Sequence, residues 1–358
     1  MTRNRLVVDF LIIGQGLAGS ILAWELRQRG CQVIIVDNAI TSASQIAAGL
    51  INPMTGMRLV KNKDIDFLLP AARSYYQNLS VFFKQPFFID RPMLRIIGTE
   101  QEHHYGLKRL NDPSYEPYLD KFTPTQSKQS FPAPFGILRQ KQTGYLQTRP
   151  LLAALQQHFK LSNTYIKTQF NYEDITFGKN SICWKHIEAK KIIFCEGYQG
   201  QNNPWFSWLP FQPVKGEILT LSSSSKLPEQ LLNYGFWLIT TSKNSFRTGA
   251  TFDRENINTK TTQQAKKTLL DALKKAAPTI ATEQIINHQA HIRPATQDKQ
   301  PFLGCHPKYP QIGIFNGFGA KGSLQIPWFA QRIADYLIKN QDLPTAADIK
   351  RYDFALKK

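Results

Sequence analysis

Three glycines in the spacing Gly14-x-Gly16-x-x-Gly19 are the first residues whose pattern indicates a chemistry. They lie between an apolar, β-rich segment at 6–13 and an amphipathic segment at 20–29, so they form the turn between a strand and a helix. In such a turn the first glycine permits the tight bend, the second lets the backbone approach a pyrophosphate, and the third lets helix and strand pack closely. The pattern therefore predicts a dinucleotide-binding turn.

Asp37 follows the next predicted strand, at 31–36, and has the spacing from the glycines that a ribose-binding acid requires. Its carboxylate would accept hydrogen bonds from ribose hydroxyls, and it disfavours a 2′-phosphate and hence NADP. The amides of Leu17 and Ala18, at the predicted helix N-terminus, complete the phosphate site. The alternative is an ordinary glycine-rich turn. With strand, helix and acid all present, we prefer dinucleotide binding.

A second glycine-rich turn, Gly317-Phe318-Gly319-Ala320-Lys321-Gly322, separates a predicted strand at 312–316 from a predicted helix at 323–339. A helix N-terminus at this point could hold a second anionic part of a cofactor, such as a reduced flavin ring. Because NAD enzymes need no second cradle of this kind, the pair of turns favours FAD. The alternative is a tight turn required only by packing.

Arg293 ends a strand-like stretch, and Pro294 breaks that stretch immediately afterwards. An arginine fixed at the end of a strand can present its planar guanidinium to a carboxylate through two hydrogen bonds. The alternative is a surface ion pair with a nearby acid such as Asp298.

Length and composition indicate a globular protein of about two domains. The chain has 358 residues, of which 42% are hydrophobic and 20% charged. The four cysteines are scattered and form no CxxC pair, which fits a reducing compartment and excludes a zinc ribbon or a disulfide scaffold. No apolar run approaches the roughly 20 residues of a membrane span, so we expect a cytoplasmic protein without such a span.

We expect no metal site and no catalytic triad. His103 and His104 lie in a polar segment without a second pair of metal-binding side chains. His288 and His306 lack a nearby serine or cysteine in a nucleophile pattern.

The charge balance is strongly basic. The chain has 44 Lys and Arg against 26 Asp and Glu, a net charge of +18. Such an excess is typical of proteins that bind nucleic acid or anionic membranes, but here the basic residues are dispersed and form no long run. We therefore prefer a general surface bias and keep an RNA ligand as the second interpretation.

The order of the predicted elements indicates a discontinuous nucleotide-binding domain. A βαβ unit comes first, mixed β segments follow, and a second glycine-rich strand, turn and helix close the sequence. Further helices are predicted at 64–83, 148–159 and 261–276. We expect the nucleotide domain to comprise 1–83, 145–212 and 300–358, and a β-rich substrate domain to comprise 84–144 and 213–299.

Seven blocks, in this order, resemble the D-amino-acid oxidase superfamily of FAD enzymes, and most of all its glycine oxidase and sarcosine oxidase branch. They are IIGQGLAGS, SASQIAAGLINP, IIFCEGYQG, PVKGEILTL, FRTGATFD, HIRPATQDKQPFLGCHP and NGFGAKGS. Each block alone is a weak signal, whereas their number and order are specific. The resemblance implies an α/β fold with a discontinuous, Rossmann-like FAD-binding domain and an inserted mixed-β substrate domain.

The resemblance also implies site residues. Arg293 takes the position of the arginine that binds the substrate carboxylate. The loop after the second strand lies near the flavin in this family, and the residues implied there are Ser42, Ser44, Ala47, Ala48 and Gly49. The turn after IIFC implies Cys195 and Gly197 in FAD packing. The turn Gly317–Gly322 lies near the isoalloxazine ring, and we place its Lys321 among both the catalytic and the cofactor-binding residues.

Three departures from the family pattern change the expected chemistry. Trp237 replaces the tyrosine that lies over the substrate in glycine oxidases, and it cannot donate a phenolic hydrogen bond, so the substrate need not be glycine. Arg247 replaces the lysine that assists the reaction with oxygen, so a cation is kept. His291 occupies the position of the cysteine that attaches FAD in sarcosine oxidases, so we expect non-covalent FAD.

These features together predict an FAD-dependent oxidoreductase that oxidises a C–N bond of a small amino acid or secondary amine by hydride transfer to flavin N5, with dioxygen or another electron acceptor. Arg293, Trp237, Arg247 and Lys321 are the expected catalytic residues. The second interpretation is tRNA modification. The oxidoreductase domain of the bacterial bifunctional wobble-uridine enzyme belongs to the same superfamily and oxidises a carboxymethylaminomethyl group carried on RNA. A third is flavin binding without turnover.

Overall fold

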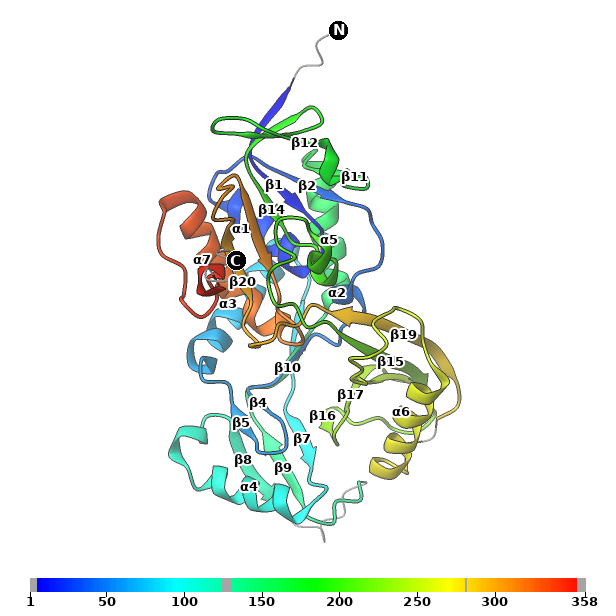
Figure 1. Ribbon diagram of the computed structural model, residues 1–358. Coiled ribbons are helices and arrows are strands. Elements are labelled where there is room, and N and C mark those ends of the chain that lie inside the picture. The colour runs from blue at the N-terminus through cyan, green and yellow to red at the C-terminus, as the bar shows by residue number, and fades with distance from the viewer. Residues whose placement is uncertain (1–4, 124–130, 281, 353–358) are drawn as a thin grey trace. The chain divides into compact units, whose positions relative to one another are not determined.

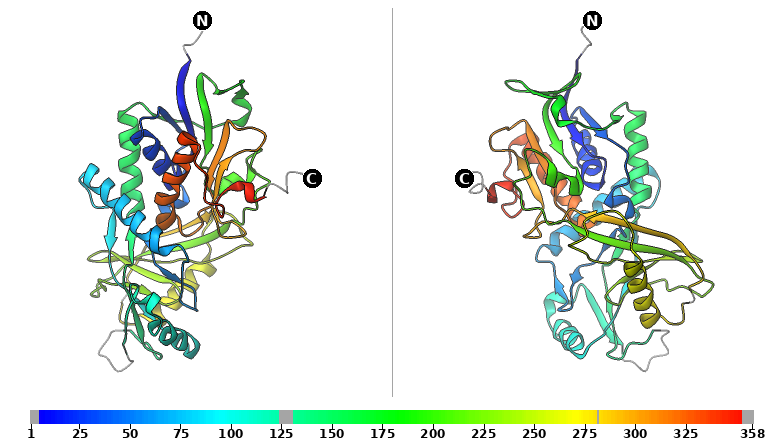
Figure 2. Two further views of the ribbon diagram at one scale, coloured as in Figure 1. Left: turned by 90° about the vertical axis from the view of Figure 1, so that its left-hand side faces the viewer. Right: turned by 45° about the vertical axis from the view of Figure 1, so that its right-hand side comes forward.

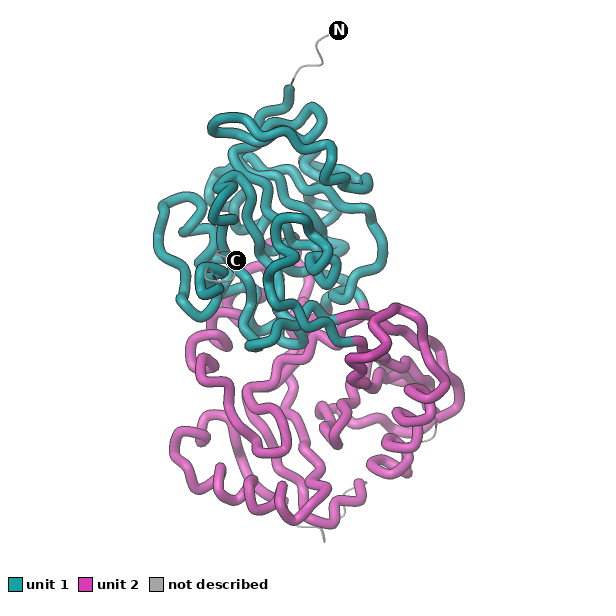
Figure 3. Tube along the Cα trace, viewed as in Figure 1, with its two compact units in different colours: residues 1–45, 148–214, 293–358 teal, residues 46–147, 215–292 magenta. Residues whose placement is uncertain are grey.

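A computed structural model describes residues 5–123, 131–280 and 282–352 (Figure 1). The chain divides into two compact units, each assembled from separate stretches of sequence (Figure 3). Unit 1 comprises residues 1–45, 148–214 and 293–358, and unit 2 comprises 46–147 and 215–292. The division differs from the sequence expectation at residues 46–83 and 145–147, which fall in unit 2, and at residues 213–214 and 293–299, which fall in unit 1.

Unit 1 is an α/β unit with one mixed sheet. Its strands are β1 (Leu6–Ile13), β2 (Val33–Asp37), β11 (Tyr165–Lys167), β12 (Ile175–Phe177), β13 (Ile182–Trp184), β14 (Ile187–Phe194), β20 (Phe302–Cys305) and β21 (Ile312–Asn316). Its main helices are α1 (Leu17–Gln28), α5 (Thr148–Leu161) and α7 (Gly322–Lys339), and the short α2 (Ala43–Ile46) lies at its boundary. Helix α1 packs against both α5 and α7, and the blue α1 and orange-red α7 run side by side in Figure 2.

Strand β14 is the centre of this sheet. One edge of β14 pairs in parallel with β1, and its other edge pairs first with the antiparallel β13 and then with the parallel β21. In the parallel series β11, β2, β1, β14 and β21, the strands β2 and β21 up to their last residue, the second half of β1 and the last three residues of β14 are apolar and buried, as strands covered on both faces require. Their side chains form a core with Trp184, Phe206 and Phe302.

Unit 2 contains an eight-stranded sheet in the order β19-β15-β18-β17-β16-β7-β9-β8, a three-stranded sheet in the order β3-β10-β6, and the hairpin β4-β5. The strands of the large sheet are β7 (Met93–Ile96), β8 (Leu119–Thr123), β9 (Ile137–Gln140), β15 (Val214–Ser222), β16 (Leu231–Asn233), β17 (Trp237–Ser242), β18 (Ser245–Gly249) and β19 (Ile285–Arg293). The remaining strands are β3 (Leu50–Ile51), β4 (Met54–Thr55), β5 (Val60–Lys61), β6 (Phe88–Asp90) and β10 (Gly144–Leu146). The helices are α3 (Ile65–Phe83), α4 (Glu100–Leu110) and α6 (Gln263–Ala276).

The large sheet buries both of its faces. Alternate residues such as Leu219, Leu238 and Phe246 form one core with Leu269 and Leu273 of α6. The opposite face carries Met93, Leu231, Ile239 and Trp237, which pack with Ala48, Leu50 and Tyr145. Strand register therefore decides which side chains belong to the face that holds Trp237.

The sequence predicted the helices α1, α3, α5, α6 and α7 and the strands β1, β2 and β21 close to their observed bounds, but it missed α4 and most of the short strands of unit 2. Thr99 accepts a hydrogen bond from the amide of Glu102 (3.1 Å), and Glu102 in turn accepts one from the amide of Gly98 (3.0 Å). This Thr-x-x-Glu pattern is a helix-start signal that the sequence did contain. No helix among residues 5–123, 131–280 and 282–352 has the length and apolar character to cross a membrane.

Candidate functional site

Two of the three N-terminal glycines are fixed by packing. Gly14 has φ +101°, and a Cβ added to it would lie 2.6 Å from the carbonyl oxygen of Cys195. A Cβ added to Gly19 would lie 1.9 Å from the carbonyl oxygen of Gly14. Both positions therefore admit only glycine, because strand β1, helix α1 and the end of β14 meet there in backbone contact.

Gly16 is different from its neighbours. Its φ of −69° suits any residue, and the nearest atom to an added Cβ is the Ser44 hydroxyl oxygen, at an ordinary contact distance of 3.5 Å. The protein itself does not exclude a side chain at Gly16. A glycine here leaves room for a ligand to approach the backbone at the N-terminus of α1.

The N-terminus of α1 is bordered by polar groups of unit 1. The amide of Leu17 donates to the Ser44 hydroxyl (3.0 Å), and Ala18 follows in the first helical turn. Asp37, at the end of β2, accepts from the amide of Gln15 (2.7 Å) through Oδ2 and from the amide of Ala39 (2.7 Å) through Oδ1. Each carboxylate oxygen has two lone pairs, so Asp37 keeps acceptor capacity for a ribose hydroxyl.

Ser42 supplies a second indication of a ligand. Its hydroxyl oxygen is buried and has no hydrogen-bond partner among the residues that the structure describes. Buried hydroxyls are normally paired, so this one is able to form a hydrogen bond with a bound ligand. Ser42 belongs, like Ser44, to the loop after β2.

Cys195 and Gly197 lie behind the glycine turn. The amide of Cys195 donates to the carbonyl of Ile13 (2.8 Å), and burial raises the pKa of the Cys195 thiol, which therefore stays neutral. Gly197 has φ +61°, and its carbonyl accepts from Asn316 (2.8 Å) at the end of β21. Cys195 is thus a packing residue, and Gly197 links the N-terminal turn to the C-terminal one.

The C-terminal glycine turn lies beside the segment that carries Arg293. Gly317 has φ +84°, and an added Cβ would lie 2.7 Å from Cγ2 of Thr296. The amide of Gly319 donates to the carbonyl of Pro294 (3.0 Å). Ala320 is exposed, and Lys321 and Gly322 begin α7. Arg293 is the last residue of β19, and the residue that follows it, Pro294, binds this turn through Gly319.

Arg293 is half-buried, and burial lowers the pKa of its guanidinium. Asp298, the acid considered as its ion-pair partner, is bound elsewhere. The Asp298 carboxylate accepts from Nε of Arg351 (2.9 Å) and from the hydroxyl of Tyr352 (2.6 Å). Asp298 thus has its ion-pair partner in Arg351.

In unit 2, Trp237 and Arg247 share one face of the large sheet. Trp237 lies opposite Gly249 and Ile239 lies opposite Arg247, so the register places all four on the same side. A Cβ at Gly249 would lie 3.2 Å from the Trp237 ring. The Arg247 guanidinium donates to the carbonyls of Ile46 and Ala47, the latter at 3.2 Å. Arg247 thus holds the loop after β2.

Two residues of that loop have packing roles within unit 2. Ala48 lies in the apolar cluster with Trp237. Gly49 has φ +69°, and a Cβ there would lie 2.0 Å from the carbonyl of Leu146, with which Gly49 forms a strand contact. The requirement for glycine at Gly49 therefore comes from strand β10.

Sequence reasoning missed Gln15 and Glu196. The Gln15 side chain is buried, donates to the Ser20 hydroxyl (3.0 Å) and to the carbonyl of Leu152 (3.2 Å), and so ties the glycine turn to α5. Glu196 accepts from Tyr172 (2.7 Å) and from Asn203 (2.9 Å), and burial raises the pKa of its carboxyl. A polar residue inside each glycine-containing turn was the available signal.

A family model described as FAD dependent oxidoreductase (DAO) matches residues 9–336. The chain belongs to this family of FAD-dependent oxidoreductases. FAD is accordingly its cofactor. The space in front of Gly16 and the unpaired Ser42 hydroxyl fit such a group, and Leu17, Asp37 and the C-terminal glycine turn are the residues of unit 1 that would hold it.

Relatives of two kinds are similar to the chain. The tRNA 5-methylaminomethyl-2-thiouridine biosynthesis bifunctional protein MnmC of Marinobacter nauticus is 25% identical over 352 residues, which cover 91% of this chain and 54% of that protein. The glycine oxidase of Pseudomonas aeruginosa is 25% identical over 154 residues, 42% of each chain. The chain thus spans about half the length of the MnmC relatives it matches.

The fold is also that of a solved glycine oxidase. The structure of the Bacillus cereus enzyme matches with a TM-score of 0.80 at 20% identity, covering 94% of this chain and 96% of that one. This likeness confirms the expected α/β, Rossmann-like fold class.

Substitution at Gly16 and at Gly19 should separate cofactor binding from folding. Gly16→Ala places its Cβ in ordinary contact with Ser44, so the protein should fold with an apoprotein melting temperature near that of wild type but purify without flavin. Gly19→Ala clashes with the Gly14 carbonyl and should fail to accumulate as folded protein. Flavin absorbance and thermal unfolding of the apoproteins measure both effects. Full flavin content in Gly16→Ala would contradict binding of the cofactor against the backbone of Gly16.

Tyr165 should make stability depend on pH in the alkaline range. Burial and the nearby Asp37 carboxylate raise the pKa of Tyr165 to about 12, against about 10 in an unfolded chain. The folded protein holds the proton more tightly, so the Tyr165 contribution to stability is present below about pH 10 and lost as the pH rises towards about 12. The melting temperature of Tyr165→Phe should therefore fall less than that of wild type over this interval. The exposed Tyr309→Phe is the matched control, and a wild-type profile in Tyr165→Phe would oppose the assignment.

Proposed function

We propose that this FAD-dependent oxidoreductase oxidises the C–N bond of an amino-acid-type amine whose carboxylate is bound by Arg293. One observation carries the proposal. Arg293 is half-buried at the end of β19, and the next residue, Pro294, accepts a hydrogen bond from the amide of Gly319 in the C-terminal glycine turn. An arginine fixed at the end of a strand can bind a carboxylate through two parallel hydrogen bonds.

The chain's own contribution would be to bind and orient. FAD, when bound, supplies the acceptor for the electrons that leave the substrate's α-C–H bond. Two hydrogen bonds from Arg293 would fix the position of the carboxylate and hence of the α-carbon. Trp237, on a sheet face of unit 2, has no phenolic hydroxyl to donate to a substrate.

We further propose that the amine is a carboxymethylaminomethyl group on the wobble uridine of tRNA. MnmC proteins are similar over about nine-tenths of this chain, whereas the curated glycine oxidase is similar over less than half. The net charge of +18 suits a polyanionic substrate. Such a group also carries a carboxylate, so Arg293 would serve the same purpose.

A free small amino acid is the second candidate substrate. The glycine oxidase relative favours it, and the fold is shared with glycine oxidase structures. In both candidates Arg293 would bind the carboxylate. They differ in the group attached to the amine nitrogen, which is the tRNA uridine in the first and a small substituent or hydrogen in the second.

Replacement of Arg293 tests the carboxylate clamp. Arg293→Ala should lower the efficiency of flavin reduction roughly 30- to 150-fold, because a charge-assisted bidentate contact contributes on the order of 2–3 kcal/mol. Arg293→Lys should also reduce the rate, since lysine keeps the charge but loses the planar fork. Flavin content should stay unchanged. Rapid-reaction flavin absorbance under anaerobic conditions measures the rate.

Arg351→Ala is the matched control, because Arg351 forms the ion pair with Asp298. It should lower the melting temperature and leave flavin reduction unchanged. Normal flavin reduction in Arg293→Ala, with a loss of stability like that of Arg351→Ala, would overturn the clamp.

Salt dependence distinguishes the two substrates. A tRNA complex should weaken steeply with salt, because log K falls in proportion to the number of phosphates contacted. Oxidation of a free amino acid should respond only modestly. Anaerobic mixing with tRNA bearing the carboxymethylaminomethyl group, and separately with glycine and N-methylglycine, shows which one bleaches the flavin. Bleaching by the free amino acids alone would remove the tRNA proposal.

A further inference from the structure

The segment that follows β18 presents an aromatic ring to solvent. Phe252 is 65% exposed, and the guanidinium carbon of Arg254 lies 5.2 Å from the centre of its ring. Phe252 comes three residues after Gly249, which faces Trp237 across the sheet. The strand that carries Arg247 and Gly249 thus leads directly into this exposed pair. We name residues 251–262 the platform loop.

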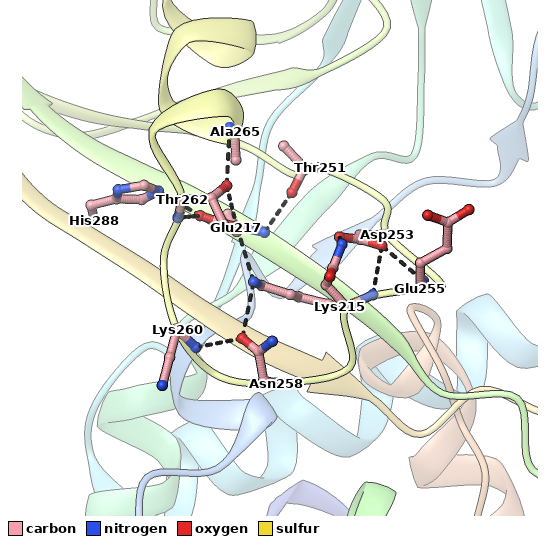
Figure 4. Close-up of polar contacts among 11 residues, drawn as sticks. Lys215, Glu217, Thr251, Asp253, Glu255, Asn258, Lys260, Thr262, Ala265 and His288 are labelled. Carbon is pink, nitrogen blue, oxygen red and sulfur yellow. Dashed lines mark hydrogen bonds and ion pairs between the residues drawn. The ribbon is translucent and has the colours of Figure 1, made fainter.

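The platform loop is fixed at its start by backbone pairing. Lys215, on β15, exchanges two main-chain hydrogen bonds with Asp253, at 2.8 and 3.0 Å. The Asp253 carboxylate then accepts from the amides of Glu255 (2.8 Å) and Asn256 (3.0 Å), as Figure 4 shows for Glu255. The backbone on both sides of Arg254 is therefore held in one conformation.

A buried ion pair fixes the rest of the loop. The side chains of Lys215 and Glu217 are 1% and 3% exposed, and Nζ lies 3.3 Å from Oε1. Nζ also donates to Oδ1 of Asn258 (3.2 Å), and Glu217 accepts from the amide (2.9 Å) and hydroxyl (3.0 Å) of Thr262 (Figure 4). His288 Nε2 lies 2.8 Å from the same carboxylate. A buried pair with this many partners is expensive to rearrange, so the loop is preorganised.

Positive charge continues from the platform loop along α6. Residues 254–275 contain six lysines and arginines against two acidic residues, Glu255 and Asp271. Thr262 caps the helix by accepting from the amide of Ala265 (3.1 Å). Because the apolar side of α6 packs against the sheet, Lys267, Lys274 and Lys275 are exposed on its outer side.

We propose that this surface binds RNA, with Phe252 and Arg254 stacking on an unpaired base and the lysines Lys260, Lys267 and Lys274 binding phosphates. The location rests on the proposed tRNA substrate. Flat aromatic and guanidinium groups stack on bases of any sequence, and a rigid support lowers the cost of ordering. Phe252 is the one large apolar side chain exposed in the described platform loop, which is too little apolar area for a lipid surface.

The test measures binding of a fluorescent anticodon-type RNA hairpin, with unmodified uridine in its loop, to the FAD-loaded protein. Phe252→Ala should weaken binding roughly 5- to 150-fold, the effect of losing one stacked base. Phe252→Tyr keeps a stacking ring and should bind like wild type. The double variant Lys267→Gln with Lys274→Gln should reduce the slope of log K against log salt by about 1.4 to 1.8.

Matched controls lie elsewhere in unit 2. Phe67→Ala removes another exposed phenylalanine, and Lys108→Gln with Lys121→Gln removes two other exposed lysines. Both should leave binding and its salt slope near wild type. Unchanged binding in Phe252→Ala would overturn the proposed RNA-binding surface. An equal reduction of the slope of log K against log salt in the control lysine pair would also overturn it. The hairpin carries no oxidisable group, so failure of the proposed chemistry would not alter these results. Normal oxidation of tRNA with unchanged binding in Phe252→Ala would overturn the surface alone.

Discussion

The approach of Gly19 to the carbonyl of Gly14 is the contact on which unit 1 depends. A single methyl group cannot enter there, so α1 is pressed against the end of β1, and the end of β14 closes the same junction at Cys195. The first amides of α1 are thereby set beside Asp37 and the Ser42 loop. Backbone packing therefore explains the glycines at positions 14 and 19, whereas nothing in the packing requires a glycine at position 16.

Unit 2 shows how one strand register serves two purposes. One face of its large sheet carries Trp237 and Arg247, while the other face packs on α6. The guanidinium of Arg247 donates to two carbonyls of the loop after β2 through two different nitrogen atoms. A lysine has a single terminal nitrogen and lacks this planar pair of donors. Strand β18 carries Arg247, which binds the loop after β2, and it leads into the exposed Phe252 three residues after its end.

Local patterns predicted the parts of the fold that depend on nearby residues. Both glycine turns, their strands and their helices follow from spacing within a short stretch of sequence, and β21 was predicted at its observed bounds. In strand β14, Lys190 and Lys191 lie in the middle of the strand and obscure the apolar pattern of its last three residues. The partners of Asp298, Arg247 and Glu217 come from distant segments, such as Arg351, Ile46 and Thr262, which no local pattern specifies.

The interleaving of the two units sets an order for synthesis on the ribosome. Strand β21 and the turn at Gly317 complete the sheet beside β14, and they emerge only after all of unit 2. Until then half of one β14 edge is an open ladder, the kind of template that draws in other chains and that chaperones shield. Until the chain has been synthesised beyond Asn316, the sheet of unit 1 therefore lacks the strand that pairs with the second half of β14.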